Sequence, residues 1–204
     1  SLYSGMGWKS LFARIRFWDA PYKQAEEMVP ESGVIVELGC GEGLFSNYLA
    51  VCSKNRKIIG IDSNISRIRQ ADRKLPNARF ISGDATKAKI PTADAIVLMH
   101  LLHHLNSYGQ QEKLLRACRS KLKKKGKLVI VEIEPKFSLK YLIVFFVDHF
   151  LVAWLFQKEL YSRIYFRKKN EWMKLLADAG FEVSSYKADK NMPFPHIIFE
   201  CIRQ

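Results

Sequence analysis

Residues 36–43 read VELGCGEG, and this stretch decides the fold that we expect for the chain. Its three glycines, Gly39, Gly41 and Gly43, stand at alternate positions after a strand-like run and before a helical pattern. Glycine allows the backbone to bend sharply and leaves no Cβ atom between the chain and a ligand. Main-chain amides at the start of a helix are also suited to polar or anionic groups. The stretch therefore predicts a strand, a ligand-binding turn and a helix in succession.

The spacing of the glycines, and the acids that follow them, narrow the choice of ligand. Leu44 stands where the dinucleotide fingerprint needs its third glycine, which argues against a pyrophosphate cofactor. Asp62 ends the next predicted strand, where a carboxylate can accept hydrogen bonds from both hydroxyls of a ribose. Asp62 could instead open the following helix as an N-cap or Asx turn. Asp84 and Ala85 follow the third strand, where they suit an adenine edge.

Downstream of the turn, strand and helix patterns alternate. Alternation of this kind indicates a doubly wound, mostly parallel sheet with helices on both faces. The link 186–197 is too short for a helix, so the last two strands are expected to pair antiparallel. Asn170 is the expected N-cap of the last helix and Gly180 its C′ residue. Strands are predicted over 33–38, 57–62, 78–83, 93–99, 127–133, 181–186 and 197–202, and helices over 44–53, 66–74, 110–122 and 170–179.

The composition suits one α/β domain, residues 33–204, preceded by a helical extension, residues 1–32, packed on it. The chain has 204 residues, with 33 Lys and Arg against 20 Asp and Glu, a net charge of +13. That surplus favours an acidic partner, such as nucleic acid, an anionic membrane or a negatively charged substrate. The four cysteines are scattered, so we expect neither a disulfide framework nor a metal site. No secretory signal pattern opens the sequence, and a cytoplasmic protein is expected.

With the glycine turn, Asp62 and Asp84 in this order, the sequence resembles the class I S-adenosylmethionine-dependent methyltransferases over residues 30–204. The segment 99–105, MHLLHHL, is similar to the stretch after strand four in small-molecule members of that family. The resemblance implies a Rossmann-like methyltransferase fold of seven strands with an antiparallel last strand. It implies S-adenosyl-L-methionine as cofactor, with the turn around its methionine part, Asp62 at the ribose and Asp84 by the adenine. The cofactor contacts that it implies are Glu37, Gly39, Cys40, Gly41, Gly43, Asp62, Ser63, Asp84, Ala85, Met99 and His100.

Candidates for catalysis lie at the ends of strands four and five. His103 and His104 follow strand four, and imidazole can take up a proton near neutral pH. The alternative is that one of them packs against the sheet and the other caps the loop. Glu132 and Glu134 end strand five at the carboxyl edge, where ligands bind in such folds. We expect only one of the two to face the pocket, and Glu134 is the candidate for acceptor contact.

Residues 137–169 form an unusually apolar and aromatic segment. In the resembling family this region commonly covers the acceptor site. A lid, a membrane attachment, a dimer contact and an ordinary buried helix pair are all open. Lys140, Asp148 and His149 within the segment argue against a membrane-spanning helix. Basic residues at its end, Arg163, Arg167, Lys168 and Lys169, suit anionic lipid headgroups.

The leading hypothesis is therefore methyl transfer to a small, largely hydrophobic acceptor that could be a lipid or a quinone. The net charge also permits an RNA or DNA methyltransferase. Against that alternative, MHLL stands where many base methyltransferases carry an Asn/Asp-Pro-Pro-aromatic motif. A third hypothesis is a non-catalytic scaffold that binds S-adenosylmethionine. The sequence leaves the oligomeric state open.

Overall fold

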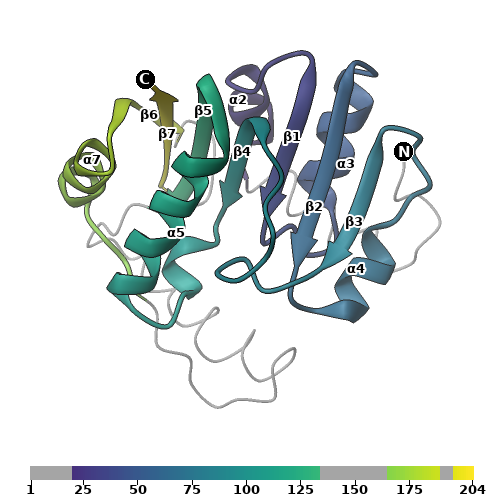
Figure 1. Cartoon of the computed structure of the whole chain (residues 1–204), viewed down its shortest axis with the longest axis horizontal. Coiled ribbons are helices and arrows are strands. Elements are labelled where there is room, and N and C mark those ends of the chain that lie inside the picture. The colour runs from purple at the N-terminus through teal and green to yellow at the C-terminus, as the bar shows by residue number, and fades with distance from the viewer. Residues whose placement is uncertain (1–19, 134–164, 189–194) are drawn as a thin grey trace.

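Seven strands form one sheet in the computed structural model, which describes residues 20–133, 165–188 and 195–204. Their order is β3-β2-β1-β4-β5-β7-β6 (Figure 1). β7 runs antiparallel to both β5 and β6, and the other neighbouring strands pair parallel. The predicted mostly parallel sheet with an antiparallel last strand is confirmed. The strands are β1 (Gly33–Leu38), β2 (Arg56–Asp62), β3 (Ala78–Ser82), β4 (Ala93–Met99), β5 (Leu122–Ile133), β6 (Phe181–Ala188) and β7 (His196–Arg203).

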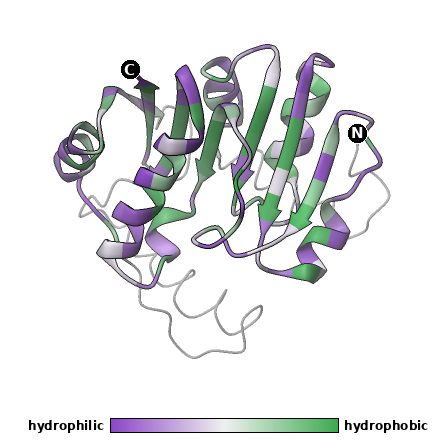
Figure 2. Ribbon diagram, in the orientation of Figure 1, coloured by the Kyte–Doolittle hydropathy of each residue, from purple (hydrophilic) through white to green (hydrophobic). Residues whose placement is uncertain are grey.

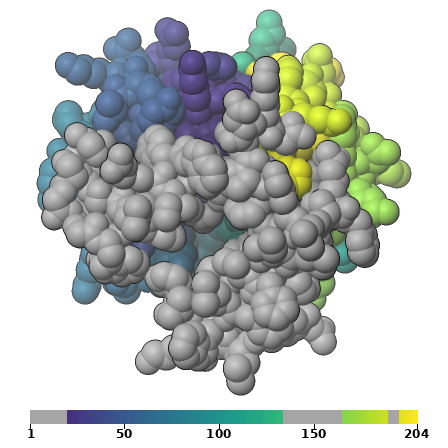
Figure 3. Space-filling view, turned by 180° about the vertical axis from the view of Figure 1, so that it is seen from behind, coloured from purple at the N-terminus to yellow at the C-terminus, as the bar shows by residue number. Residues whose placement is uncertain are grey.

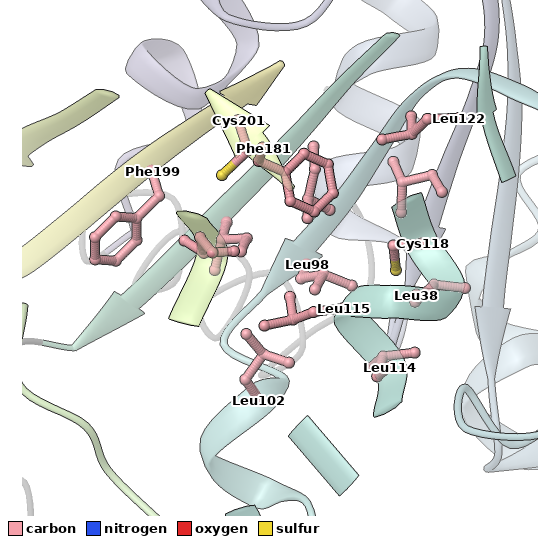
Figure 4. Close-up of a cluster of buried hydrophobic side chains, with 14 of the residues drawn as sticks. Leu38, Leu98, Leu102, Leu114, Leu115, Cys118, Leu122, Phe181, Phe199 and Cys201 are labelled. Atoms are coloured by element: carbon pink, nitrogen blue, oxygen red, sulfur yellow. The ribbon is translucent and has the colours of Figure 1, made fainter. Parts of the chain in front are cut away.

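Helices cover both faces of the sheet, because its central strands are apolar on both sides (Figure 2). Leu38 and Leu98 pack with the helices α5 and α7 on one face (Figure 4). Ile35 and Val97 pack with α2 and α3 on the other face. Figure 3 shows the surface of the molecule from that side. The helical elements are α2 (Tyr22–Glu27), α3 (Leu44–Cys52), α4 (Ile65–Ala71), the short 3₁₀ turn η1 (Leu102–His104), α5 (Tyr108–Lys121) and α7 (Lys169–Asp178).

Among the element boundaries that differ from the prediction, three have local reasons. α4 ends at Ala71, and the Asp72 carboxylate accepts hydrogen bonds from the backbone N and the ammonium of Lys74. α7 begins at Lys169, and its N-cap is Lys168 in place of Asn170, because the Glu171 carboxylate accepts from the Lys168 backbone N at 2.6 Å. β5 begins at Leu122 because this residue pairs with Ala93 ahead of an irregular stretch.

Of the N-terminal extension, the structure describes residues from Ala20 onward. Tyr22 and Ala25 of α2 are buried against Phe45 and Leu49 of α3. The Tyr22 and Phe45 ring centroids lie 5.2 Å apart. Within the described part of the chain, no helix has the length and apolar character needed to cross a bilayer.

Candidate active site

The predicted turn between β1 and α3 lies at the carboxyl edge of the sheet. Gly39, Gly41 and Gly43 have φ values of +71°, +54° and +70°, a region that side chains with a Cβ atom rarely adopt. A Cβ atom on Gly39 would lie 2.7 Å from the Leu101 side chain. One on Gly41 would meet no atom of the described residues within 4 Å. The turn is thus packed from one side and open above Gly41, where a ligand could reach its backbone.

Two side chains beneath the turn are buried. Glu37 is 2% exposed, and the Ser46 hydroxyl donates a hydrogen bond to its carboxylate at 2.5 Å. Burial raises the pKa of Glu37 to about 7, the Ser46 hydrogen bond opposes that rise, and the Asp62 charge adds to it. Burial also raises the pKa of the Cys40 thiol far above its usual range. The Cys40 sulfur lies close to Gly60, so this side chain packs under the turn.

Asp62 holds the turn from the end of β2. Its carboxylate accepts hydrogen bonds from the backbone N of Gly41 at 2.9 Å and from that of Asn64 at 2.8 Å. The second contact is the Asx turn that the sequence offered as an alternative, although Asn64 is the actual N-cap of α4. A carboxylate has about four lone-pair positions, so two bonds leave capacity for a ligand's hydroxyls. Ser63, the next residue, is exposed.

Asp84 and Ala85 follow β3 as expected. Asp84 is exposed, and it accepts hydrogen bonds from the Thr86 hydroxyl at 2.7 Å and the Thr86 backbone N at 2.8 Å. These bonds hold the pKa of Asp84 below its usual range. Ala85 packs at the rim of the core. The structure thus shows Asp84 in a local turn with Thr86.

The end of β4 presents a row of histidines. Met99 is buried, and His100 takes a left-handed backbone with φ of +51° while its N donates to the Val131 carbonyl at 2.9 Å. His103 is 2% exposed, whereas His104 is exposed. The two sequence candidates for catalysis therefore lie in different environments.

Glu132 is the partner of His103. One oxygen of its carboxylate lies 2.5 Å from His103 Nδ1, and the other accepts from the Leu102 backbone N at 2.9 Å. Glu132 is 1% exposed, so this pair is held inside the protein. Glu134, the sequence candidate, lies outside the described residues. The expectation that only one of the two glutamates can face the pocket is wrong for a regular strand, since alternate residues point to the same side.

Residues 165–167 cover the His103 pair. The Tyr165 backbone N donates to the His103 carbonyl at 2.9 Å. The Phe166 ring stacks on the His103 ring with centroids 5.0 Å apart and planes at 21°. Arg167 bonds within the chain, to the side chains of Gln111 and Glu112. The contact of the basic group with lipid headgroups stays a prediction. The rest of the apolar segment up to residue 164 lies outside the described residues.

Sequence reasoning also missed His196. It begins β7, is 2% exposed, and meets His100 edge to face at a centroid distance of 5.0 Å. No local motif marks this residue, because the antiparallel return of β7 brings it to the carboxyl edge of the other strands.

A family model for a methyltransferase domain matches residues 11–186. This match spans most of the chain and includes the glycine turn, Asp62 and the His103–Glu132 pair. The chain belongs to the class I S-adenosylmethionine-dependent methyltransferases.

Curated relatives are between 26% and 34% identical to this methyltransferase over the residues that align. Demethylmenaquinone methyltransferase of Thermotoga maritima is 26% identical over 172 residues, which cover 78% of this chain and 73% of that protein. Trans-aconitate 2-methyltransferase of Paracidovorax citrulli is 30% identical, over 56% of this chain and 46% of that one. Isoflavone 4′-O-methyltransferase of Medicago truncatula is 33% identical, over 60% of this chain and 32% of that protein. The chain thus spans less than half the length of the last two relatives.

Solved structures show the same fold. A methyltransferase from Methanosarcina mazei has a TM-score of 0.69 at 20% identity, over 90% of this chain and 97% of that one. Magnesium protoporphyrin IX methyltransferase from Synechocystis, solved with S-adenosylhomocysteine, has a TM-score of 0.68 at 16% identity. The match covers 95% of this chain and 84% of that one.

The described residues fit the cofactor of this family. The open side of Gly41 leaves the main chain accessible, as a cradle for the methionine part requires. Asp62 has unused acceptor capacity at the end of β2, where a ribose would lie. When bound, S-adenosylmethionine supplies an electrophilic methyl group on a sulfonium.

The Asp62→Ala variant is expected to bind S-adenosylmethionine more weakly by over about 1 kcal/mol, because the hydrogen bonds to the ribose and the Gly41 contact are both lost. Isothermal titration calorimetry measures the change. Asp72→Ala is the matched control, because this exposed carboxylate lies at the far end of α4 and pairs with Lys74. Equal affinities for the Asp62→Ala variant and the unchanged protein would count against this cofactor site.

Binding of S-adenosylmethionine is expected to release a proton from Glu37 below about pH 7. Without ligand, burial keeps this carboxyl protonated up to a pKa of about 7. The positive charges of the ligand favour the ionised form, so affinity should rise with pH up to about 8 and then level off. Calorimetry in two buffers of different ionisation enthalpy counts the released protons. Glu37→Gln should abolish the release, and an unchanged proton count in that variant would assign it to another group.

The raised pKa of Glu37 should also affect stability. We expect the free energy of unfolding to fall with pH where the affinity for S-adenosylmethionine rises. Because the pKa of Glu37 is raised in the folded state, its contribution to stability is present at low pH, below the unfolded value. That contribution is lost as the pH rises from 4.5, the ordinary pKa of a glutamate, to about 7. The ligand-free protein should therefore lose this part of its free energy of unfolding over the range in which its affinity increases.

Proposed function

We propose that this S-adenosylmethionine-dependent methyltransferase methylates a small, largely hydrophobic acceptor, and that His103 removes a proton from it. The observation that carries the proposal is the buried His103–Glu132 pair under Phe166, at the same edge of the sheet as the glycine turn. β4 and β1 are neighbours in register, Leu98 beside Leu38, so the turn and the histidine follow adjacent strand ends.

Glu132 prepares His103 for the role of a base. A carboxylate can only accept a hydrogen bond, so this contact favours the tautomer in which Nδ1–H donates to Glu132 and Nε2 can accept a proton from a ligand. The second Glu132 oxygen is bound to the Leu102 backbone N, so the carboxylate cannot turn away. The pair therefore suits an acceptor whose hydroxyl, amine or activated carbon loses a proton during methyl transfer.

Exclusion of water is the second contribution of the chain. Methyl transfer is an in-line displacement, and alignment of the reactants supplies much of its rate. Phe166 stacks on one face of His103, and the neighbouring Leu102 of η1 is buried. Apolar walls beside a buried base favour a hydrophobic acceptor over a highly charged one.

The relatives support this acceptor class without naming the acceptor. Their own names give demethylmenaquinone, an isoflavone and trans-aconitate as substrates, two of which are ring compounds of low polarity. The apolar composition of residues 137–169, for which the sequence left a lid, an attachment, a dimer contact and a buried helix pair open, supports the same class.

The proposal is tested by methyl transfer from radiolabelled S-adenosylmethionine to three probes: a reduced prenylated naphthoquinone, a simple phenol, and total tRNA. Label in either of the first two, at a rate that changes little with salt, is the expected result. Label in tRNA alone, with a rate that falls steeply with salt, would establish the nucleic-acid alternative. Binding of the cofactor without label in any probe would favour a non-catalytic scaffold.

A further inference from the structure

Gln111 occupies a position on α5 where helical spacing predicts an apolar side chain. Its neighbours on the same face, Leu114, Leu115 and Cys118, are all buried in the core. Gln111 itself has 0% exposure. A buried amide destabilises a core unless its polar atoms are hydrogen-bonded. The choice of glutamine here therefore depends on what the amide contacts.

All polar atoms of the Gln111 side chain are engaged. Its Nε2 donates to the carbonyl of Leu102 at 3.0 Å and to that of Tyr165 at 2.8 Å. Its Oε1 accepts from Arg167 Nε at 2.8 Å. Two carbonyls require the NH₂ group and a guanidinium requires the oxygen, so only one orientation of the amide satisfies this set.

The two carbonyls belong to the segments that hold His103. Leu102 precedes His103 in η1, and its backbone N is bound to Glu132. Tyr165 donates its backbone N to the His103 carbonyl. Its neighbour Phe166 stacks on the imidazole. Gln111 thus ties the backbone on one side of His103 to the chain that covers its ring.

Arg167 fixes the oxygen of the amide. Its guanidinium lies 4.6 Å from the Tyr108 ring centroid and 5.6 Å from that of Trp172. Its Nη2 donates to Glu112 at 3.3 Å. The rigid fork of arginine, held between two rings, leaves Gln111 little freedom to reorient.

We propose that Gln111 is a positioning residue for His103, which it reaches through the carbonyls of Leu102 and Tyr165. The amide holds the imidazole with Nδ1 toward Glu132 and Phe166 over its face, so that Nε2 stays aimed at the acceptor. This inference rests on the proposed role of His103 as the base.

The first test needs no acceptor. Nitrogen-15 NMR of the histidine rings in the ligand-free protein should show His103, assigned with His103→Gln, as a single neutral tautomer with its proton on Nδ1. In Gln111→Leu, the His103 ring signals should move toward the average of the two tautomers. Gln110→Leu, the same change one residue earlier on α5, should leave them in place. Unchanged His103 signals in Gln111→Leu would overturn the inference.

Gln111→Met, which keeps the length of the side chain and removes the amide, is the second variant in case Gln111→Leu does not fold. Spectra below the melting temperature report only the folded protein, so a purely structural loss would lower the melting temperature without moving the His103 signals.

A double-variant cycle with the labelled phenol or quinol separates this inference from the proposed function. Gln111→Leu should lower kcat roughly 10–100-fold, with the Kd for S-adenosylmethionine unchanged, and should have no further effect in His103→Gln. Full activity of His103→Gln would refute the base role itself. An impaired His103→Gln to which Gln111→Leu adds its full effect would refute only the positioning role.

Discussion

The His103→Gln variant is expected to lose roughly 10²- to 10⁴-fold in kcat, the usual contribution of a general base. Glutamine keeps much of the shape of the imidazole and can still bond to Glu132, but it cannot accept a proton from the acceptor. The affinity of the variant for S-adenosylmethionine should stay the same, because His103 is not among the residues that we expect to bind the cofactor. Radiolabel transfer to a phenol or quinol measures the first effect, and calorimetry the second.

Two companion variants make this result specific. Glu132→Gln should lose activity to a comparable extent, since a neutral carboxamide has one acceptor oxygen for the two groups that the carboxylate binds, His103 Nδ1 and the Leu102 backbone N. Asn106→Ala, an exposed change on the loop after η1, should retain full activity. A kcat for His103→Gln within about threefold of the unchanged protein would mean that removal of a proton by His103 does not contribute to the rate.

The free energy of unfolding of the Arg56→Ala variant is expected to be lower by about 3–5 kcal/mol than that of the unchanged protein. Arg56 is 1% exposed, and its guanidinium donates to the carbonyls of Val29, Pro30 and Leu49 and pairs with Glu26 at 2.7 Å. Removal of the side chain leaves buried carbonyls without donors and also opens a cavity. Urea unfolding followed by tryptophan fluorescence measures the change.

Lys57→Ala is the control for this prediction, because the neighbouring residue is exposed and should change stability by less than about 0.5 kcal/mol. Arg56→Lys should recover little of the loss, since an ammonium cannot match the planar fork that reaches carbonyls on both sides. A loss below about 1 kcal/mol for Arg56→Ala would show that water replaces the guanidinium easily.

Much of the cofactor half of the site could be predicted because its signals are local. The glycines of residues 39–43 follow their strand directly, and their positive φ values appear at the expected places. Asp62 lies at the end of β2, and it binds the turn through Gly41, a contact that its position made possible. The Asx turn with Asn64 shows that the structural alternative for Asp62 was also correct.

The catalytic half was less accessible to prediction. His103 and His104 are adjacent and chemically identical, so the sequence could not tell which of them is buried. Glu132 and Glu134, two residues apart, posed the same problem for the sequence. No role for Gln111 could be predicted, because the function of an amide on an apolar helix face depends on hydrogen-bond partners that the sequence does not reveal.

The sequence by itself determined the order of strands and helices and the sharp turn after β1, because hydrophobic period and glycine spacing act over a few neighbouring residues. Only the tertiary structure decided that His103 meets Glu132, which is 29 residues away along the chain. That contact follows from the register of β4 on β5, Met99 beside Val131, which places the turn after one strand over the end of the next. Packing across the whole sheet sets this register, and no short stretch of sequence contains it.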